Sequence, residues 1–175
     1  MNGWLRHWRR CSRGSDHRQD PGYTGNGKGK TTASLGLSFR AVGHGLSVCV
    51  IQFIKKQRCG EHVSAGMLEI EIVQSALPDV RQAVQEQMQR AWNCIEQHKC
   101  DVLVLDEILG SLGRGYVNLE DVLAIMDARP EAMELVLTGR NAPPEVISKA
   151  DLVTSMECVK HYYHTGLSAR EGIES

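Results

Sequence analysis

The chain has 175 residues, of which 42% are hydrophobic and 23% are charged, so it is long and apolar enough to fold as one ordinary domain. Its formal net charge of -1 argues against binding nucleic acid through overall charge. No apolar run approaches the roughly 20 residues that cross a bilayer, so we expect a soluble protein without a membrane partner. Six cysteines are scattered without a C-x-x-C pair, which favours a cytoplasmic protein over a disulfide framework.

Residues 1–21 differ from the rest of the chain, because they are rich in arginine and contain no run of β-branched residues. Three interpretations stay open: a targeting peptide, a disordered or accessory arm, or a start or reading frame assigned wrongly upstream. We favour the third, which a reading of the genomic DNA upstream of the Tyr23 codon in all frames would test. We predict an atypical segment over 1–21 and one folded domain over 22–175.

A glycine-rich loop follows at residues 24–32, with the sequence Thr-Gly-Asn-Gly-Lys-Gly-Lys-Thr-Thr. Glycines let backbone amides approach an anion closely, and a helix predicted from Thr31 adds its positive N-terminal end. This pattern is typical of a Walker A loop, in which Lys30 neutralises a phosphate and the Thr31 hydroxyl binds Mg²⁺. The alternative is a plain surface loop. The predicted phosphate-binding residues are Gly25, Asn26, Gly27, Lys28, Gly29, Lys30, Thr31 and Thr32.

Two features of this loop are unusual for the pattern. Thr24 stands where the first glycine of a Walker A loop is expected. A phosphate-binding loop also normally follows a buried strand, whereas residues 13–22 are polar and contain glycine and proline. We therefore predict that no buried strand precedes the loop.

Helices and strands are expected to alternate beyond the loop. Helical periodicity and capping signals predict helices over residues 31–42, 79–98, 118–128 and 143–150. Apolar or alternating runs predict strands over residues 46–54, 68–73, 101–105, 133–138 and 152–156. This alternation predicts an α/β fold in three layers, with a mostly parallel sheet and helices on both faces.

Two carboxylates, Asp106 and Glu107, end the apolar strand predicted over 101–105. A buried strand that delivers acid at its carboxyl end is typical of the Walker B element, which holds Mg²⁺ directly or through water. The alternative is a strand that simply ends in acids at the surface. Because this strand lies about seventy residues behind a Walker A loop, we predict a metal site at Asp106 and Glu107.

Several basic residues follow the predicted strands. Ligands of open α/β sheets bind outside the carboxyl ends of the strands, so the Lys55, Lys56 and Arg58 cluster either faces an anion or forms a solvated loop. Arg140 either contacts a phosphate or forms a surface salt bridge. His161 and His164 have a spacing that could bind metal on a helix, but a polar loop is favoured because no third ligand is evident.

Motifs along the chain resemble those of the P-loop ATP:corrinoid adenosyltransferases. The resemblance runs from Tyr23 to the C-terminus, and Thr24 in place of the first glycine is similar to family usage. The motifs are the loop over 24–32, Arg40-Ala41-Val42-Gly43-His44-Gly45, Val50-Ile51-Gln52-Phe53-Ile54-Lys55, Leu105-Asp106-Glu107, Ala128-Arg129-Pro130, Leu137-Thr138-Gly139-Arg140-Asn141-Ala142-Pro143, Ala150-Asp151-Leu152-Val153, Val159-Lys160-His161 and Gly172-Ile173-Glu174.

The resemblance implies a RecA-like P-loop NTPase fold and a reaction of adenosylcobalamin biosynthesis. In that reaction the 5′-deoxyadenosyl group of ATP passes to Co(I) of cob(I)alamin or cob(I)yrinic acid a,c-diamide, and tripolyphosphate leaves. It implies Mg²⁺ or Mn²⁺ at Thr31, Asp106 and Glu107, catalytic roles for Lys30 and Glu107, and phosphate binding by the loop with Arg140. It also implies a reductase that supplies Co(I), and a homodimer.

Two departures from the family pattern leave other functions open. The family's apolar strand before the loop is not recognisable, and residues 74–78 lack the Phe and Trp that help some members remove the lower cobalt ligand. One alternative is a truncated relative that binds nucleotide or corrinoid without chemistry. The other is a P-loop ATPase or phosphoryl-transfer enzyme, in which Glu107 positions water and orthophosphate is released.

Overall fold

The computed structural model describes residues 18–162, 166 and 168–173. In this part of the chain, parallel strands form one six-stranded sheet in the order β3-β2-β4-β5-β1-β6. The strands are β1 (Pro21–Thr24), β2 (Val48–Gln52), β3 (Glu71–Val73), β4 (Val102–Asp106), β5 (Glu134–Thr138) and β6 (Leu152–Ser155). The helices are α1 (Lys30–Gly43), α2 (Gly60–Met67), α3 (Val80–Glu96), α4 (Ile108–Gly113), α5 (Leu119–Ala128) and α6 (Pro144–Lys149).

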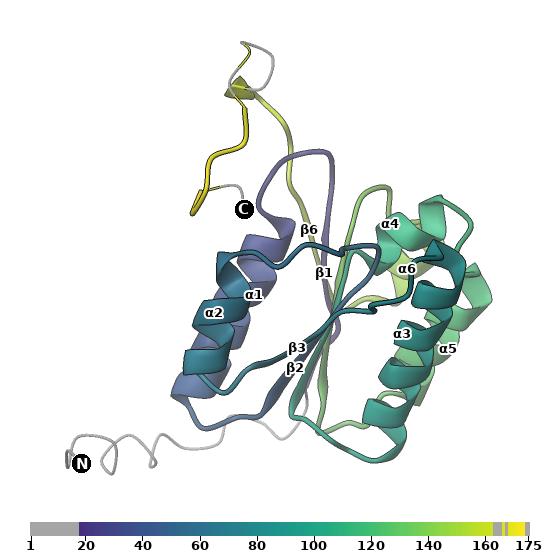
Figure 1. Cartoon of the computed structure of the whole chain (residues 1–175). Coiled ribbons are helices and arrows are strands. Elements are labelled where there is room, and N and C mark those ends of the chain that lie inside the picture. The colour runs from purple at the N-terminus through teal and green to yellow at the C-terminus, as the bar shows by residue number, and fades with distance from the viewer. Residues whose placement is uncertain (1–17, 163–165, 167, 174–175) are drawn as a thin grey trace, which may run out of the picture.

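The sheet separates two layers of helices, which confirms the predicted three-layer α/β fold (Figure 1). α1 and α2 cover one face, while α3, α4, α5 and α6 lie on the other. Strand residues alternate between two apolar cores: Cys49 and Ile51 of β2 face the core with α3 and α5, and Val50 faces the core with α1. Burial on both faces explains why the central strands are continuous apolar runs. None of the helices described is long and apolar enough to span a membrane.

A strand does precede the glycine-rich loop, so the prediction that none exists is wrong. β1 pairs in parallel with β5 on one side and with β6 on the other, where Tyr23 lies opposite Thr138 and Thr154 respectively. The sequence pattern conceals β1 because the strand has only four residues, two of which are Pro21 and Gly22. Proline is tolerated at the first residue of a strand, and pairing on both sides stabilises a segment whose own strand propensity is weak.

The residues just before β1 also pack against the domain. Arg18 N donates to the Glu131 carbonyl at 3.1 Å, and Gln19 N donates to a Glu134 carboxylate oxygen at 2.9 Å. Asp20 is buried, and its carboxylate lies 2.5 Å from the Arg129 guanidinium. Residues 18–21 therefore belong to the packed fold, although the predicted division places them in the atypical segment. The rest of that segment, residues 1–17, lies outside the described part of the chain.

The other predicted elements are present with bounds that differ by a few residues, and two helices were not predicted. The five strands predicted after the loop correspond to β2, β3, β4, β5 and β6, and the four predicted helices to α1, α3, α5 and α6. α2 and α4 have eight and six residues and contain several glycines, which weaken a helical pattern. The carboxyl ends of β1, β2, β4 and β5 meet at one edge of the sheet, where the glycine-rich loop and Glu107 also lie.

Candidate nucleotide-binding site

The glycine-rich loop connects β1 to α1 and rests against the chain that leaves β6. Gly25 has a φ of +93°, and a Cβ there would lie 2.5 Å from the Met156 carbonyl oxygen. At Gly27 a Cβ would lie 2.7 Å from the carbonyl oxygens of Met156 and Glu157, and Gly27 N donates to Met156 O at 2.6 Å. Gly29 precedes α1 with a φ of +113°. The loop therefore needs these glycines for close backbone contact and for left-handed conformations.

Lys30 begins α1 and is only 7% exposed. Its ammonium donates to the carbonyl oxygens of Gly25 and Gly27, both at 2.7 Å, so it lies inside the curve of the loop. Burial, and then the nearby positive charge of Arg140, lower the pKa of Lys30 from its usual value. An anion bound in the loop would favour the charged lysine, because opposite charges stabilise each other most strongly where water is excluded.

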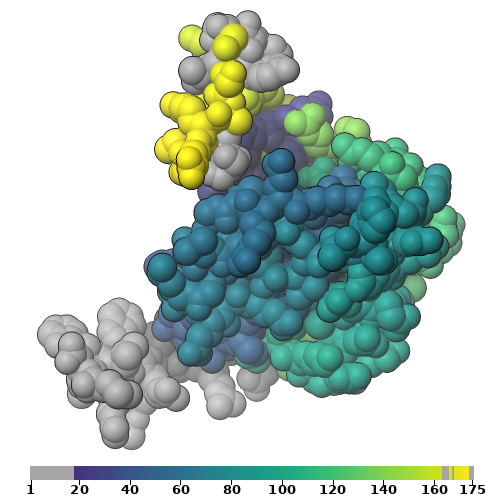
Figure 2. Space-filling view, in the orientation of Figure 1, coloured from purple at the N-terminus to yellow at the C-terminus, as the bar shows by residue number. Residues whose placement is uncertain are grey.

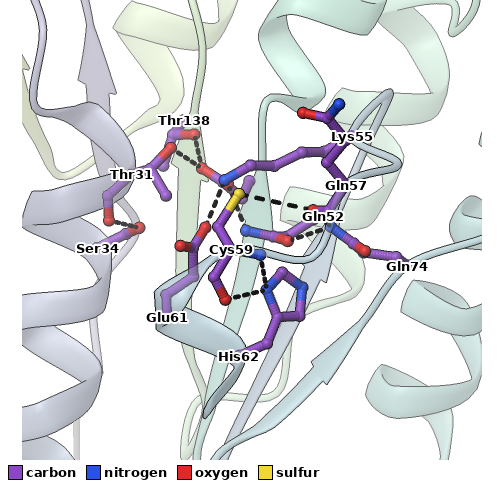
Figure 3. A network of polar contacts seen from close by, with 11 residues as sticks. Thr31, Ser34, Gln52, Lys55, Gln57, Cys59, Glu61, His62, Gln74 and Thr138 are labelled. Carbon is purple, nitrogen blue, oxygen red and sulfur yellow. Dashed lines mark hydrogen bonds and ion pairs between the residues drawn. The ribbon is translucent and has the colours of Figure 1, made fainter. Parts of the chain in front are cut away.

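Asp106 ends β4 and lies directly beneath the start of α1, with 1% of its surface exposed. Its Oδ1 accepts hydrogen bonds from the hydroxyls of Thr31 at 2.9 Å and Thr138 at 2.7 Å. Its Oδ2 accepts a bond from Gln52 Nε2 at 3.3 Å. Three donors from three different elements hold this carboxylate in a fixed orientation (Figure 3).

Glu107 follows Asp106 at a sharp corner between β4 and α4. Its φ of +64° is uncommon for a residue other than glycine, and its N–H donates to the Thr138 hydroxyl at 2.9 Å. Two glycines make room for this corner: a Cβ on Gly110 would lie 2.2 Å from Glu107 Oε1, and one on Gly139 would lie 2.6 Å from Gly110 N. Strained backbone of this kind often occurs where a side chain is held for function.

A cavity of about 820 Å³ opens above the loop and Glu107. Its lining is mostly polar and includes the cationic side chains of Lys28, Lys30, Lys55, Arg114 and Arg140. The predicted site residues that line it are Asn26, Gly27, Lys28, Gly29, Lys30, Thr31, Thr32, Glu107 and Arg140. Lining residues that the sequence did not single out are Leu35, Gly60, Glu61, Ser64 and Arg114, while Gly172 and Ile173 belong to the last of the family motifs. Gly25 and Asp106 lie behind this lining, where they contact Lys30 and Thr31.

The other basic residues that follow the predicted strands lie in different surroundings. Lys55 and Arg140 line the cavity, and Lys55 Nζ lies 2.6 Å from Glu61 Oε1. Lys56 points elsewhere, since its ammonium donates to the Pro78 carbonyl at 2.6 Å. His161 lines the cavity, whereas His164 lies outside the described residues.

The C-terminal segment forms one wall of this cavity. Lys28 Nζ donates to the Tyr162 hydroxyl at 3.0 Å and to the Ile173 carbonyl at 3.3 Å. The Arg170 guanidinium lies 5.2 Å from the centre of the Tyr162 ring, a cation–π arrangement. Figure 2 shows the C-terminal residues, in yellow, as a projection at the end of the molecule that carries the loop. The segment therefore limits access to the phosphate-binding loop from this side.

The oxygen groups at the base of the cavity fit a hard divalent cation. The Thr31 hydroxyl, whose proton points to Asp106, keeps lone pairs for a metal, and the Glu107 carboxylate lies in the same cavity. Within the described residues, no group of three His, Cys, Asp or Glu could hold a metal. A metal that keeps water and takes further oxygens from a nucleotide, as Mg²⁺ commonly does, agrees with this small donor set.

Sequence reasoning did not identify Thr138, Gln52 or Arg114 as parts of the site. Thr138 ends β5 beside the carboxyl end of β4, so its place at a strand end was an available signal. Gln52 is the single amide in an otherwise apolar strand, which is also a signal. Arg114 follows α4, a helix that the pattern did not predict, so no signal placed it at the cavity.

A glycine-rich loop between a central parallel strand and a helix, with a buried Asp beneath it, defines a P-loop nucleotide-binding protein. The family described as ATP:corrinoid adenosyltransferase BtuR/CobO/CobP matches residues 22–175. The chain is 37% identical to the corrinoid adenosyltransferase of Pseudomonas aeruginosa over 164 residues, covering 87% of this chain and 81% of that protein. It is 33% identical to the Escherichia coli K12 corrinoid adenosyltransferase over 162 residues, covering 87% and 83%. The chain belongs to the ATP:corrinoid adenosyltransferase family.

The similarity of this chain to solved structures is weaker than its similarity to these relatives. The flagellar accessory protein FlaH of Methanocaldococcus jannaschii has a TM-score of 0.49 with 15% sequence identity, covering 79% of this chain and 71% of that one.

Proposed function

We propose that this chain transfers the 5′-deoxyadenosyl group of ATP to the Co(I) of a corrinoid, in adenosylcobalamin biosynthesis. A cobalt–carbon bond forms, the bond between C5′ and the triphosphate oxygen breaks, and its electron pair leaves with tripolyphosphate. The observation that carries this proposal is the family's match over 22–175, together with the cationic cavity above Lys30 and Thr31. Co(I) is itself the nucleophile, so the protein needs no general base.

The protein's part is to position ATP and to stabilise the charge that develops on the leaving group. Lys30 and the N-terminal end of α1 lie where the triphosphate would bind, and Lys28 and Arg140 line the same cavity. Donors fixed in place before reaction stabilise a transition state most, because they need not reorganise as charge develops. A cavity with this charge therefore suits tripolyphosphate as a leaving group.

A divalent cation, Mg²⁺ or Mn²⁺, belongs to the same proposal. Thr31 and Glu107 would hold it with the nucleotide, and Asp106 would orient the Thr31 hydroxyl or bind a metal-bound water. When bound, the cation neutralises charge on the departing triphosphate. Glu107 then acts as a metal ligand in this reaction, rather than as the residue that positions water for hydrolysis.

β1 removes the main argument for a defective relative. A loop without a strand to anchor it could misplace the triphosphate by about 1 Å, enough to cost large factors in rate. Because β1 is paired on both sides, the loop starts from a fixed point in the sheet. This anchoring supports an active enzyme.

We also propose a cytoplasmic location, a homodimer and a reductase that supplies Co(I). All five cysteines of the described residues, Cys49, Cys59, Cys94, Cys100 and Cys158, are free thiols, as expected in a reducing compartment. The dimer and the reductase rest on the family resemblance.

The test is an anaerobic assay with purified full-length protein, Mg-ATP and chemically reduced cob(I)alamin. A photolabile alkyl-cobalt product, followed by absorbance, with one tripolyphosphate for each cobalt alkylated, is the expected result. Orthophosphate without alkyl-cobalt would instead establish an ATPase. ATP binding measured by calorimetry, with neither product, would indicate the non-catalytic relative.

A further inference from the structure

Two side-chain amides, those of Gln52 and Gln74, form a hydrogen-bonded chain that ends at Asp106, and Figure 3 labels both glutamines. Gln52 ends β2 and is 0% exposed. Its Nε2 donates to Asp106 Oδ2 at 3.3 Å, and its Oε1 accepts a 2.8 Å bond from Gln74 Nε2. Gln74 follows β3 and is half-buried, so two hydrogen bonds connect the buried carboxylate to the segment that follows β3.

The hydrogen bonds define which way each of the two glutamine side-chain amides is oriented. A carboxylate can only accept hydrogen bonds, so Gln52 must present its NH₂ group to Asp106 and its oxygen to Gln74. Gln74 in turn must present its NH₂ group, which also lies 3.2 Å from the Gln57 carbonyl. If Gln74 lost its donors, no other hydrogen bond within the described part of the chain would hold Gln52 Oε1, and a flipped amide would turn that oxygen toward the Asp106 carboxylate.

The main chain at Gln52 is held separately. The Gln87 side-chain amide donates to the Gln52 carbonyl, and Phe53 N donates to the Asp106 carbonyl at 2.8 Å. These bonds hold the main chain at the end of β2 independently of the conformation of the Gln52 side chain. The Gln52 and Gln74 side chains are thus available to orient the Asp106 carboxylate, whose other oxygen receives the Thr31 hydroxyl.

We propose that Gln52 and Gln74 are positioning residues for the metal site: Gln74 fixes the orientation of the Gln52 amide, and Gln52 fixes Asp106 Oδ2. This inference rests on the proposed function, because it takes Thr31, Asp106 and Glu107 as the site of a cation bound with ATP. Groups that hold a metal-site carboxylate commonly change metal affinity 10–100-fold when they are removed. The pair also ties this site to residues 74–78, since Gln74 begins that segment.

The experiment measures Mg²⁺-dependent ATP binding by titration calorimetry for the full-length wild type, Gln52→Leu, Gln74→Leu and the double variant. We expect each single variant to raise the half-saturating Mg²⁺ concentration by about tenfold, with ATP binding in excess EDTA changed less than about twofold. If Gln74 acts through Gln52, the double variant will be no worse than Gln52→Leu. If the double variant instead raises the half-saturating Mg²⁺ concentration by the product of the two single-variant factors, Gln74 does not act through Gln52.

Gln87→Leu is the matched control, because it removes a buried amide that holds the Gln52 main chain and leaves the Gln52 side chain intact. It is expected to lower the melting temperature of the metal-free protein without changing the Mg²⁺ requirement. If Gln52→Leu does not fold, the Mg²⁺ requirement of Gln74→Leu, whose substitution lies at a more exposed position, tests the proposal by itself.

Failure of this inference is distinct from failure of the proposed function. A wild type that makes alkyl-cobalt and tripolyphosphate, with a Mg²⁺ requirement that neither variant alters, would overturn the positioning role alone. A wild type in which Mg²⁺ does not affect ATP binding would overturn the positioning role and the proposed metal site, whereas a wild type that makes no alkyl-cobalt would overturn the proposed adenosyl transfer.

Discussion

Thr31 and Asp106 are 75 residues apart in the chain, yet the Thr31 hydroxyl donates a 2.9 Å hydrogen bond to Asp106 Oδ1. The bond joins the first turn of α1 to the end of β4. α1 follows β1, and β5 lies between β1 and β4 in the sheet. It gives the Thr31 oxygen a single orientation, with its proton on Asp106 and its lone pairs toward the cavity. The fold itself thus brings the proposed metal ligand Thr31 together with the carboxylate that orients it.

Replacing Thr31 with valine tests this arrangement, because valine keeps the shape and removes the hydroxyl. We expect the half-saturating Mg²⁺ concentration for ATP binding to rise by at least about tenfold. Thr31→Ser restores the hydroxyl and is expected to return most of the affinity. A valine variant that requires no more Mg²⁺ than the wild type would show that Thr31 does not bind the metal.

Lys30 is expected to contribute to the chemical step through its charge. Lys30→Ala should lower the rate of alkyl-cobalt formation at saturating substrates by roughly 10²–10³-fold, the loss seen when one donor to a developing anion is removed. Lys99→Ala is the control, since Lys99 is exposed and precedes β4 at the opposite edge of the sheet. A Lys30→Ala enzyme as fast as the control would exclude this role.

Gly27→Ala tests the close packing of the loop against residues 156 and 157. Its Cβ would lie 2.7 Å from two carbonyl oxygens, so we expect about 1–3 kcal/mol of lost unfolding free energy, together with weaker ATP binding. Gly36→Ala, within α1, is the matched control because a Cβ there meets nothing within 4 Å. That variant should be as stable as the wild type or more stable by about 0.5–1 kcal/mol. Urea unfolding and calorimetry measure both effects, and equal behaviour of the two variants would contradict the packing argument.

Asp20 should make stability depend on pH. Burial raises the pKa of Asp20 from 3.8 to about 6, against the opposing effect of Arg129. Between these values the folded protein keeps a proton that the unfolded chain has released, so this contribution to stability falls as pH rises through that window. Asp20→Asn lacks the titrating group. Its unfolding free energy relative to wild type should therefore increase from about pH 4 to about pH 7, by up to about 3 kcal/mol.

Urea unfolding across this pH range measures the difference, with the exposed Asp127→Asn variant as a control. Asp127 lies in α5, with 69% of its side chain exposed. A relative stability of Asp20→Asn that stays constant, or that falls with pH, would mean that the ion pair with Arg129 outweighs burial.

Much of the fold and the loop could be predicted because they depend on patterns of residues that are close together in the sequence. Long apolar runs predicted the strands β2, β4 and β5, and the glycines before Lys30 predicted the loop. β1 could not be predicted in this way. Its four residues include Pro21 and Gly22, and its stability comes from β5 and β6, which lie more than a hundred residues further along the chain.

The carboxylates of the site were predictable, but the groups that orient them were not. Asp106 and Glu107 follow an apolar run, which is a local signal. Thr138 and Gln74 contribute through contacts that only the folded sheet creates, at separations of 32 residues from Asp106 and 22 residues from Gln52. A side chain that acts through another side chain leaves no periodic pattern in the sequence.

The position of β1 between β5 and β6 has a consequence for the order of events during protein synthesis. β1 and the loop are made well before the backbone against which Gly25 and Gly27 pack, which belongs to residues 156 and 157. The ribosome must therefore deliver the chain as far as residue 157 before the phosphate-binding loop can take its final shape. A nascent chain that is stalled before β6 should have most of its sheet available but no competent nucleotide site.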